Sequence, residues 1–435
     1  MKRITPCLLV AAIACSASAT WLDLNSAILD LTGADTSSST YSDALSVQAT
    51  TAGDVLVIST FSTEAANKTG LGEWQLSYGG QTSTSISRTL DSKNDIGIAS
   101  VVHVFTNVTG GSNINLQHRT SANDTLTTSG ANLVAIPLTT STGEKLNHGI
   151  YQQTSGFQTG SPTFVGTGMQ TSVQLDRASN NGIYIAASFN AQAIDAAETG
   201  SWQLQYRLAG GSWVNTGTEM KRAMGSTSDK GAVTLYALEE GLPPGTYEVQ
   251  LAGKSETGET VETLNGTLAA VALSYTNETG GGYFDGFAVD DTSLNEVGGP
   301  YDGVQLTLNL ENPDSDVFTS MSFYSKAGVG KNQTSAFDLW ATNAVSEYSN
   351  QGNQRLFEDG TDFGSGGSVA YFSNVEAGEL TLFGRKDEVS GQSEVPGVTL
   401  VGFSTEAIPE PAVITLFAGC GISMIFVRRI FGKQA

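Results

Sequence analysis

The run Asp54-Val55-Leu56-Val57-Ile58-Ser59-Thr60-Phe61 is strand-like, and the chain of 435 residues contains two counterparts of it. These are Gly182-Ile183-Tyr184-Ile185-Ala186-Ala187-Ser188-Phe189 and Asp316-Val317-Phe318-Thr319-Ser320-Met321-Ser322-Phe323. Each run is largely apolar and ends in Ser or Thr followed by Phe, a composition typical of a buried strand. The first two copies lie 128 residues apart, which indicates an internal repeat.

Other segments keep their order around each run. Trp74-Gln75-Leu76-Ser77-Tyr78 follows the first run, and Trp202-Gln203-Leu204-Gln205-Tyr206 follows the second. Phe337-Asp338-Leu339-Trp340 matches them more loosely in the third copy. Each copy then closes with a glycine-led alternating segment and a short apolar one, at 111–116 with 133–138, 245–251 with 268–273, and 378–383 with 400–403. The repeat therefore has three copies.

The period within each copy is two, since Trp74, Leu76 and Tyr78 alternate with polar residues. Gly, Asn, Asp and Ser separate the short runs, and helical periodicity is confined to the two ends. We therefore predict an all-β protein of three tandem antiparallel β-sandwich domains, jelly-roll or immunoglobulin-like, arranged like beads. The predicted domains span 20–140, 148–276 and 283–407, with linkers at 139–147 and 276–282.

The closing strand of the first two copies has the pattern Leu-x-Ala-Ile/Val-x-Leu. This pattern resembles the jelly rolls of the complement and tumour-necrosis-factor superfamily. The third copy departs from it at Leu400-Val401-Gly402-Phe403. The resemblance implies a jelly-roll topology and leaves the immunoglobulin-like alternative open.

The first 19 residues have the three parts of a secretory signal peptide, which would form a short helix. Lys2 and Arg3 are basic, residues 8–14 are apolar, and Ala17-Ser18-Ala19 is a small-residue cleavage site. Signal peptidase would then release a chain that begins at Thr20. Ala12-Ile13-Ala14-Cys15 offers an alternative, a lipoprotein box with lipidation at Cys15.

The last residues have three elements in a fixed order: Pro409-Glu410-Pro411, sixteen uncharged residues at 412–427, and Arg428-Arg429. The uncharged stretch would span about 24 Å as a transmembrane helix. The arrangement resembles the PEP-CTERM sorting signal of Gram-negative bacteria. That resemblance implies transient anchoring in the inner membrane, processing by an exosortase, and delivery to the cell surface or the extracellular space. An ordinary anchor that is never cleaved remains the alternative.

Removal of both ends changes the chemistry of the chain. Cys7, Cys15 and Cys420 all lie in the removed segments, so the mature protein would have no disulfide, thiolate zinc site or catalytic thiol. The full chain has a net charge of -22; the mature one keeps 16 basic residues against 43 acidic ones, Glu410 included, a net charge of -27. Nucleic acid and anionic lipid are poor partners for such a surface.

Few side chains in the body suggest a site. His103 lies in an apolar strand, and the equivalent positions of the other copies hold Tyr236 and about Ala370. No spacing supports a catalytic role for His103, His118 or His148. Trp74 and Trp202 are expected in the core, whereas Trp213, which follows a turn, is the candidate carbohydrate contact. No cofactor or metal is predicted, because the acidic clusters have the composition of solvated loops; calcium is the alternative at one of them, Asp285 with Asp290 and Asp291, Asp314 with Asp316, or Glu358-Asp359 with Asp362.

Three hypotheses follow. The first is a secreted structural or interaction protein of the cell surface or extracellular matrix, with no catalytic activity. The second is a carbohydrate-binding or adhesion module that recognises exopolysaccharide, suggested by Trp213. The third is an extracellular polysaccharide hydrolase, which only the compatibility of the fold supports.

Overall fold

The computed structural model describes residues 24–404, with gaps at 66–69, 91–94, 122–124, 140–144, 177–180, 275–286, 291–303, 311–313, 328–332, 358–362 and 391–392. The expected signal-peptide helix and the transmembrane helix of the tail lie outside the described residues. Within them the chain forms antiparallel strands and no helix, which confirms the all-β prediction. It follows that no helix of this part is long and apolar enough to cross a membrane.

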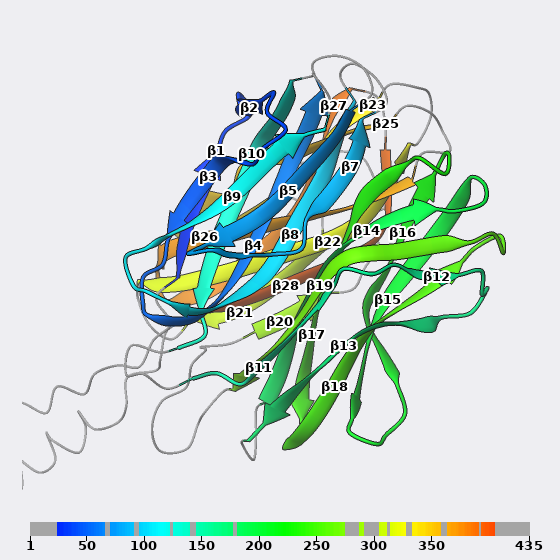
Figure 1. Ribbon diagram of the computed structural model, residues 1–435. Coiled ribbons are helices and arrows are strands. Elements are labelled where there is room, and N and C mark those ends of the chain that lie inside the picture. The colour runs from blue at the N-terminus through cyan, green and yellow to red at the C-terminus, as the bar shows by residue number, and fades with distance from the viewer. Residues whose placement is uncertain are drawn as a thin grey trace, which may run out of the picture.

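The described residues form six sheets, and the strands of each sheet come from one segment of the chain (Figure 1). We call β1 to β10 unit 1, β11 to β19 unit 2 and β20 to β28 unit 3. Each unit has an inner sheet, which faces the other units, and an outer sheet.

Three inner sheets share one strand order. In unit 1 it is β1-β10-β4-β8 with β2 on β10, from Asn25–Leu29 (β1), Ala34–Thr36 (β2), Gly53–Ala65 (β4), Ile96–Val108 (β8) and Leu126–Pro137 (β10). In unit 2 it is β11-β19-β14-β17 with β12 on β19, from His148–Gln153 (β11), Phe157–Thr159 (β12), Asn181–Ala193 (β14), Lys230–Leu242 (β17) and Val261–Ser274 (β19). In unit 3 it is β20-β28-β22-β26, from Phe287–Asp290 (β20), Ser315–Ala327 (β22), Phe363–Val375 (β26) and Ser393–Ser404 (β28).

Three outer sheets also correspond to one another. In unit 1 the order is β3-β9-β5-β6 with β7 on β5, from Ser42–Gln48 (β3), Gly70–Tyr78 (β5), Gln81–Thr82 (β6), Ile86–Leu90 (β7) and Asn113–Thr120 (β9). In unit 2 it is β13-β18-β15-β16, from Val165–Leu175 (β13), Glu198–Leu208 (β15), Val214–Met224 (β16) and Gly245–Ser255 (β18). In unit 3 it is β21-β27-β23-β24 with β25 on β23, from Val304–Leu310 (β21), Gln333–Thr342 (β23), Glu347–Ser349 (β24), Asn353–Phe357 (β25) and Gly378–Ser390 (β27).

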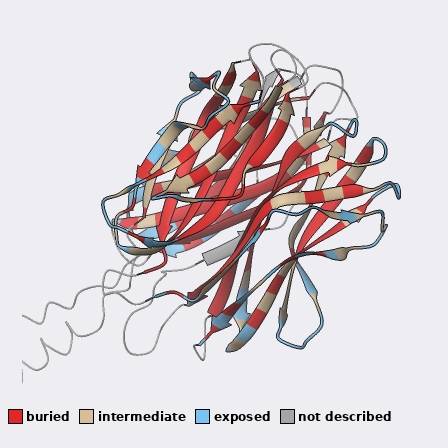
Figure 2. Ribbon diagram, viewed as in Figure 1, coloured by how far each residue is buried: buried red, intermediate tan, exposed pale blue. Residues whose placement is uncertain are grey.

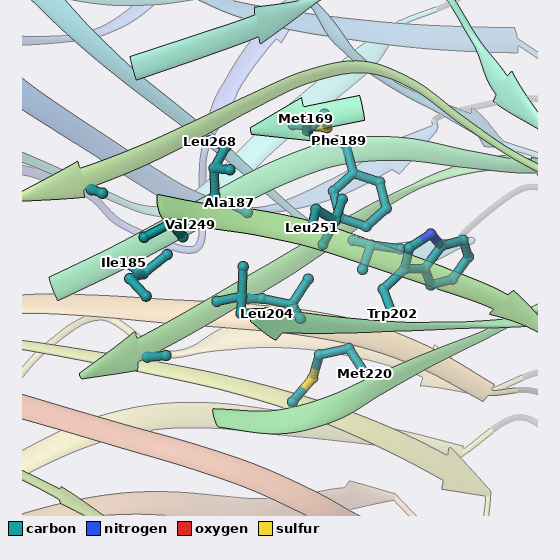
Figure 3. Packing of buried hydrophobic residues seen from close by; sticks show 14 of the residues in the cluster. Met169, Ile185, Ala187, Phe189, Trp202, Leu204, Met220, Val249, Leu251 and Leu268 are labelled. Atoms are coloured by element: carbon teal, nitrogen blue, oxygen red, sulfur yellow. The ribbon is translucent and has the colours of Figure 1, made fainter. Parts of the chain in front are cut away.

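An apolar core fills the space between the inner and outer sheet of each unit. In unit 2 the ring of Phe189 lies 5.4 Å from that of Trp202 (Figure 3). The Trp202 Nε1–H donates to Thr263 Oγ1 over 2.8 Å. The same arrangement recurs in unit 1, where Phe61 lies 5.3 Å from Trp74. The prediction that both tryptophans pack in the core is therefore confirmed, because neither is exposed.

A fourth apolar cluster joins the three inner sheets. It includes Ile58 and Val102 from unit 1, Tyr184 from unit 2, and Phe318 and Phe403 from unit 3. The long inner strands are buried on both faces, whereas the outer strands alternate between buried and exposed residues (Figure 2). The units are thus not separate beads, because they pack around a common centre where β17 contacts both β8 and β22.

The strands β8, β17 and β26 lie at the edge of their inner sheets, so the N–H groups on their outer side need partners. In each case the next unit supplies the Ser or Thr hydroxyl that precedes Phe in the repeated run. The three donor and acceptor pairs are Val102 N–H to Ser188 Oγ (3.0 Å), Tyr236 N–H to Ser322 Oγ (3.1 Å) and Val369 N–H to Thr60 Oγ1 (3.2 Å). Unit 1 thus bonds to unit 2, unit 2 to unit 3 and unit 3 to unit 1, which closes a ring.

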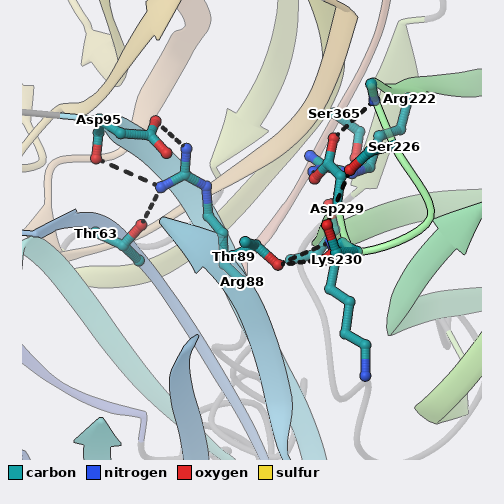
Figure 4. A network of polar contacts seen from close by, with 12 residues as sticks. Thr63, Arg88, Thr89, Asp95, Arg222, Ser226, Asp229, Lys230 and Ser365 are labelled. Atoms are coloured by element: carbon teal, nitrogen blue, oxygen red, sulfur yellow. Dashed lines mark hydrogen bonds and ion pairs between the residues drawn. The ribbon is translucent and has the colours of Figure 1, made fainter. Parts of the chain in front are cut away.

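Buried arginines line the contacts between units. Arg88 pairs with Asp95 in unit 1, and Arg222 pairs with Asp229 in unit 2 over 2.7 Å (Figure 4). Beside them the Thr89 hydroxyl donates to Ser228 O over 2.9 Å and accepts from the Lys230 N–H over 3.0 Å, which bonds unit 1 to unit 2.

Both guanidinium groups lie against a glycine. A Cβ at Gly97 would overlap Arg88, and a Cβ at Gly231 would overlap Arg222. Arg355 and Gly364 have the same relationship in unit 3. A larger residue at any of these glycines would therefore force the guanidinium group to shift.

Candidate functional site

Trp213 lies on the outer sheet of unit 2, just before β16, and is half-buried. The Arg207 guanidinium lies over its ring, with Cζ 4.2 Å from the ring centroid. Arg207 Nε in turn pairs with Glu248 Oε2 over 2.5 Å, and the two residues are register partners on β15 and β18. An aromatic ring, a cation and a carboxylate thus form one row across the sheet, which holds the indole in place.

A row of amides runs beside this one. The Gln250 Nε2–H donates to Gln205 Oε1 over 2.8 Å, and the Gln205 Nε2–H donates to Asn215 Oδ1 over 2.8 Å. Asn215 is exposed and Gln205 and Gln250 are half-buried, so this row is accessible from solvent. Amide groups held in a line can donate to and accept from the hydroxyl groups of a ligand.

The electrostatics of the row suit binding better than proton transfer. Tyr206 lies on the opposite, core-facing side of β15, where burial, reinforced by Glu239, raises its pKa to about 12, so its phenol is neutral at neutral pH. The charge of Arg207 is balanced by Glu248. The exposed apolar side chains of Leu208 (47%) and Val214 (48%) lie on the opposite face of these strands, because Val214 is the register partner of Tyr206.

Unit 3 carries a related group on its outer sheet. Arg385 lies over the half-buried ring of Trp340, 5.0 Å from its centroid, and pairs with Asp387 through two bonds of 2.9 and 2.6 Å. The Trp340 Nε1–H donates to Asp338 Oδ2 over 2.7 Å. Burial raises the pKa of Asp338, opposed by the bond from Trp340. Phe383, the register partner of Trp340, is buried beside it.

In unit 1 the corresponding group contains tyrosine. Arg119 lies over the Tyr41 ring at 4.5 Å and pairs with Glu73. Burial and the nearby Glu73 raise the pKa of Tyr41.

The histidines lie apart from these groups. His103 and His118 are buried in unit 1, and burial lowers the pKa of each to about 4. Thr128 Oγ1 accepts from the Trp74 Nε1–H over 2.8 Å, so its own proton is free to be donated to His118 Nδ1, 2.9 Å away. That bond fits a neutral imidazole that keeps its proton on Nε2.

The strand register corrects one alignment made from sequence. Val57 faces His103 across β4 and β8, Ile185 faces Ala237, and Thr319 faces Ala370. His103 therefore corresponds to Ala237 rather than Tyr236, because the shift by one residue places Tyr236 on the opposite face of the strand. The match with Ala370 is confirmed.

Most of the acidic clusters fall outside the described residues, namely Asp285, Asp291, Glu358, Asp359 and Asp362, and the side chain of Asp290 is likewise not described. Asp314 and Asp316 are described. In the part of the chain that the structure describes, no three His, Cys, Asp or Glu side chains gather as a metal site would require.

The processing sites also lie outside the described ranges. They are Ala17, Ala19 and Thr20 at the N-terminal cleavage site, and Pro409, Glu410, Pro411, Arg428 and Arg429 in the tail.

Sequence reasoning missed the buried arginines, although a signal for them exists. Arg88, Arg222 and Arg355 each precede an aspartate by seven residues, and a glycine follows two residues after that aspartate. The pattern Arg-x6-Asp-x-Gly thus occurs once in each unit. The stacking of Arg207 on Trp213 had no such signal, and the Glu248 that pairs with Arg207 lies 41 residues from it.

No family model matches the chain, and a comparison with curated proteins likewise finds no match. Among solved structures, the chain is similar to Eiger TNF from S. frugiperda at 10% identity, covering 27% of this chain and 93% of that one, with a TM-score of 0.22. It is also similar to the N-terminal CBM22-1-CBM22-2 tandem domain of Xyn10C from Paenibacillus barcinonensis at 9% identity, covering 58% and 92%, with a TM-score of 0.18. Likenesses at these TM-scores carry no argument about function.

Proposed function

We propose that this protein is a structural or interaction protein of the cell surface or extracellular matrix, exported and processed at both ends. It consists of three sandwich domains, 20–140, 148–276 and 283–407. Signal peptidase acts before Thr20, and an exosortase acts at Pro409-Glu410-Pro411 after transient anchoring in the inner membrane. The sequence signals at both ends support this route.

The observation that carries the proposal is the closed ring of three units. Residues 20–408 contain no cysteine, so packing must hold the protein together outside the cell. The ring provides that packing, since one edge strand of each inner sheet, β8, β17 or β26, is covered by the next unit. It also turns three polar outer sheets towards the surroundings, which suits a protein that contacts extracellular polymers.

Both ends of the described chain meet the same apolar cluster, which contains Leu24 and Phe403. The leader and the sorting tail would therefore join the folded body at residues of this cluster.

Mass spectrometry of the protein recovered from cells and medium tests the route. We expect an N-terminus at Thr20 and a C-terminus within 409–411, whereas a chain that ends at Ala435 in both fractions would overturn processing. Release of reducing sugars from a polysaccharide panel by the purified protein would overturn the non-catalytic role.

The outer sheet of unit 2 favours a second candidate, a carbohydrate-binding or adhesion module. The face of Trp213 opposite Arg207 can stack on a sugar ring, and the Gln250–Gln205–Asn215 row can bond to hydroxyl groups. We expect Trp213→Ala to lower affinity for exopolysaccharide at least about tenfold, a loss of about 1.4 kcal/mol. Tyr151→Ala is the control, because Tyr151 is an exposed aromatic residue of β11 on an inner sheet. An unchanged affinity in Trp213→Ala would remove this candidate.

A further inference from the structure

We propose that Trp340 on the outer sheet of unit 3 is a second carbohydrate-binding platform, so that the protein binds neutral polysaccharide at two faces and bridges polymer chains. This proposal rests on the carbohydrate-binding function proposed for Trp213. We use "platform" for a tryptophan with its stacked arginine and paired carboxylate: Trp213, Arg207 and Glu248, or Trp340, Arg385 and Asp387.

The two platforms have the same chemistry at different positions of the repeat. Trp340 lies on β23 three residues after Phe337, which takes the place of Trp202 in unit 3. The counterpart of Trp340 in unit 2 is therefore Gln205 on β15, whereas Trp213 directly precedes the neighbouring strand β16. Because the two tryptophans occupy different positions of the repeat, the repeat itself does not account for this likeness. A shared binding role does account for it.

Each platform has a tryptophan side chain that is partly exposed to solvent. The guanidinium occupies one face of the indole, at 4.2 Å for Trp213 and 5.0 Å for Trp340, and each side chain remains only half-buried. The C–H groups of a pyranose ring favour the electron-rich face of an indole. Stacked arginine also fixes the ring orientation, which reduces the entropy lost when a ligand binds.

Hydrogen-bonding groups lie beside both rings. Unit 2 provides the carboxylate of Glu248 and the amides of Gln205 and Asn215. Unit 3 provides the carboxylates of Asp338 and Asp387. Oxygen acceptors of this kind accept hydrogen bonds from the hydroxyl groups of a sugar.

Charge selects a neutral polymer over an acidic one. Arg207 and Arg385 are both paired, so neither guanidinium is free to attract the carboxylate of an acidic sugar. Asp338 adds a second acidic side chain beside Trp340. The net charge of -22 further repels polyanions.

The ring of units separates the platforms. Each lies on an outer sheet, and the inner sheets of units 2 and 3 face each other across the common cluster. The two faces therefore belong to different sides of one rigid body. A polymer with many identical sugars can engage both, which raises avidity and links separate strands.

Affinity electrophoresis in mannan, dextran and xyloglucan gels tests the binding, with alginate as the acidic comparison. Aggregation of beads coated with the retained polymer tests the bridging. The variants are Trp213→Ala, Trp340→Ala and the double variant, with Tyr151→Ala as the control and Trp340→Phe to preserve an aromatic ring. Circular dichroism melting establishes that each variant is folded.

We expect each single alanine variant to bind the polymer at least about tenfold more weakly and to lose bead aggregation, because avidity requires both platforms. The double variant should lose retention, while Tyr151→Ala and Trp340→Phe behave like the wild type. Wild-type aggregation by Trp340→Ala would overturn the second platform, because bridging would then not depend on Trp340. Retention by alginate alone would overturn the proposal that the ligand is a neutral polysaccharide. Retention by none of the polymers would overturn both carbohydrate-binding proposals.

Discussion

The hydroxyl of Ser188 in unit 2 accepts a hydrogen bond from the backbone N–H of Val102 in unit 1 over 3.0 Å. Val102 is fully buried and Ser188 is 1% exposed, so water has no access to this N–H group. The neighbouring Phe189 points the other way, into the core of unit 2. The dipeptide Ser188-Phe189 therefore contributes both to the contact between units 1 and 2 and to the core of unit 2.

Ser188→Ala should lower the free energy of unfolding by about 1–3 kcal/mol, because a buried donor loses its acceptor. Urea unfolding measures this change. Ser172→Ala on the exposed face of β13 is the matched control and should stay within about 0.5 kcal/mol of the wild type. Equal losses in the two variants would contradict a specific contribution from the bond between units.

Gly231→Ala should destabilise the protein, since the new methyl group overlaps the Arg222 guanidinium. We expect a loss of about 1–3 kcal/mol from the forced shift of a packed side chain. Gly225→Ala provides the control, because a Cβ there meets no atom within 4 Å. Thermal melting of both variants gives the comparison, and a Gly231→Ala protein as stable as Gly225→Ala would refute the close packing.

Asp229→Asn should cost about 3–5 kcal/mol, because it leaves the buried Arg222 without its ionic partner. Burial opposes ionisation of Asp229, but Arg222, the Gly225 N–H and Arg88 outweigh it and lower the pKa. The stabilisation is thus present above the unfolded pKa of about 3.9 and is lost as pH falls further.

Denaturation of Asp229→Asn at pH 7 and at pH 3 tests both statements. The gap between variant and wild type should narrow at the lower pH. A constant gap would show that the charge of Asp229 is not the source of the stabilisation.

Unit 1 should lose stability in mild acid because of its two buried histidines. Burial lowers the pKa of His103 and of His118 to about 4, while an unfolded histidine titrates near about 6.5. Between these pH values the unfolded chain binds protons that the folded chain does not, so stability present above pH 6.5 falls as the pH approaches 4. Each shift corresponds to a loss on the order of 3 kcal/mol.

His103→Phe removes one of these groups without adding a titrating one. Its unfolding midpoint should depend less on pH between 6.5 and 4 than that of the wild type. His148→Phe is the control, because His148 lies outside the core of unit 1 and is half-buried. An identical pH slope in His103→Phe and the wild type would contradict the assignment.

Much of the local structure was predictable from sequence. The period of two in Trp74-Gln75-Leu76-Ser77-Tyr78 correctly places the tryptophan inside and the glutamine outside, because a strand alternates its faces. The Ser/Thr-Phe endings correctly mark equivalent strands in the three units.

The ring itself could not be predicted in this way. β8 is buried on both faces. Its sequence has the same apolar pattern whether its second face packs against its own domain or against another one. Likewise, the sequence favours solvent exposure for Arg88 and Arg222, because arginine is rarely buried unless it is paired. In the structure both are buried. Trp213 was identified, but the Arg207 that stacks on it is held by Glu248 through the pairing of β15 with β18, which joins distant parts of the chain.

The closed ring also affects how the protein can change. In an assembly of three identical chains, every substitution appears three times, at the shared contacts and on each outer face. Here one gene encodes the three units separately, so an outer sheet can acquire a tryptophan in one unit while the other two keep glutamine or serine at that place. The contacts that hold the ring remain alike, and each outer face is free to take its own chemistry.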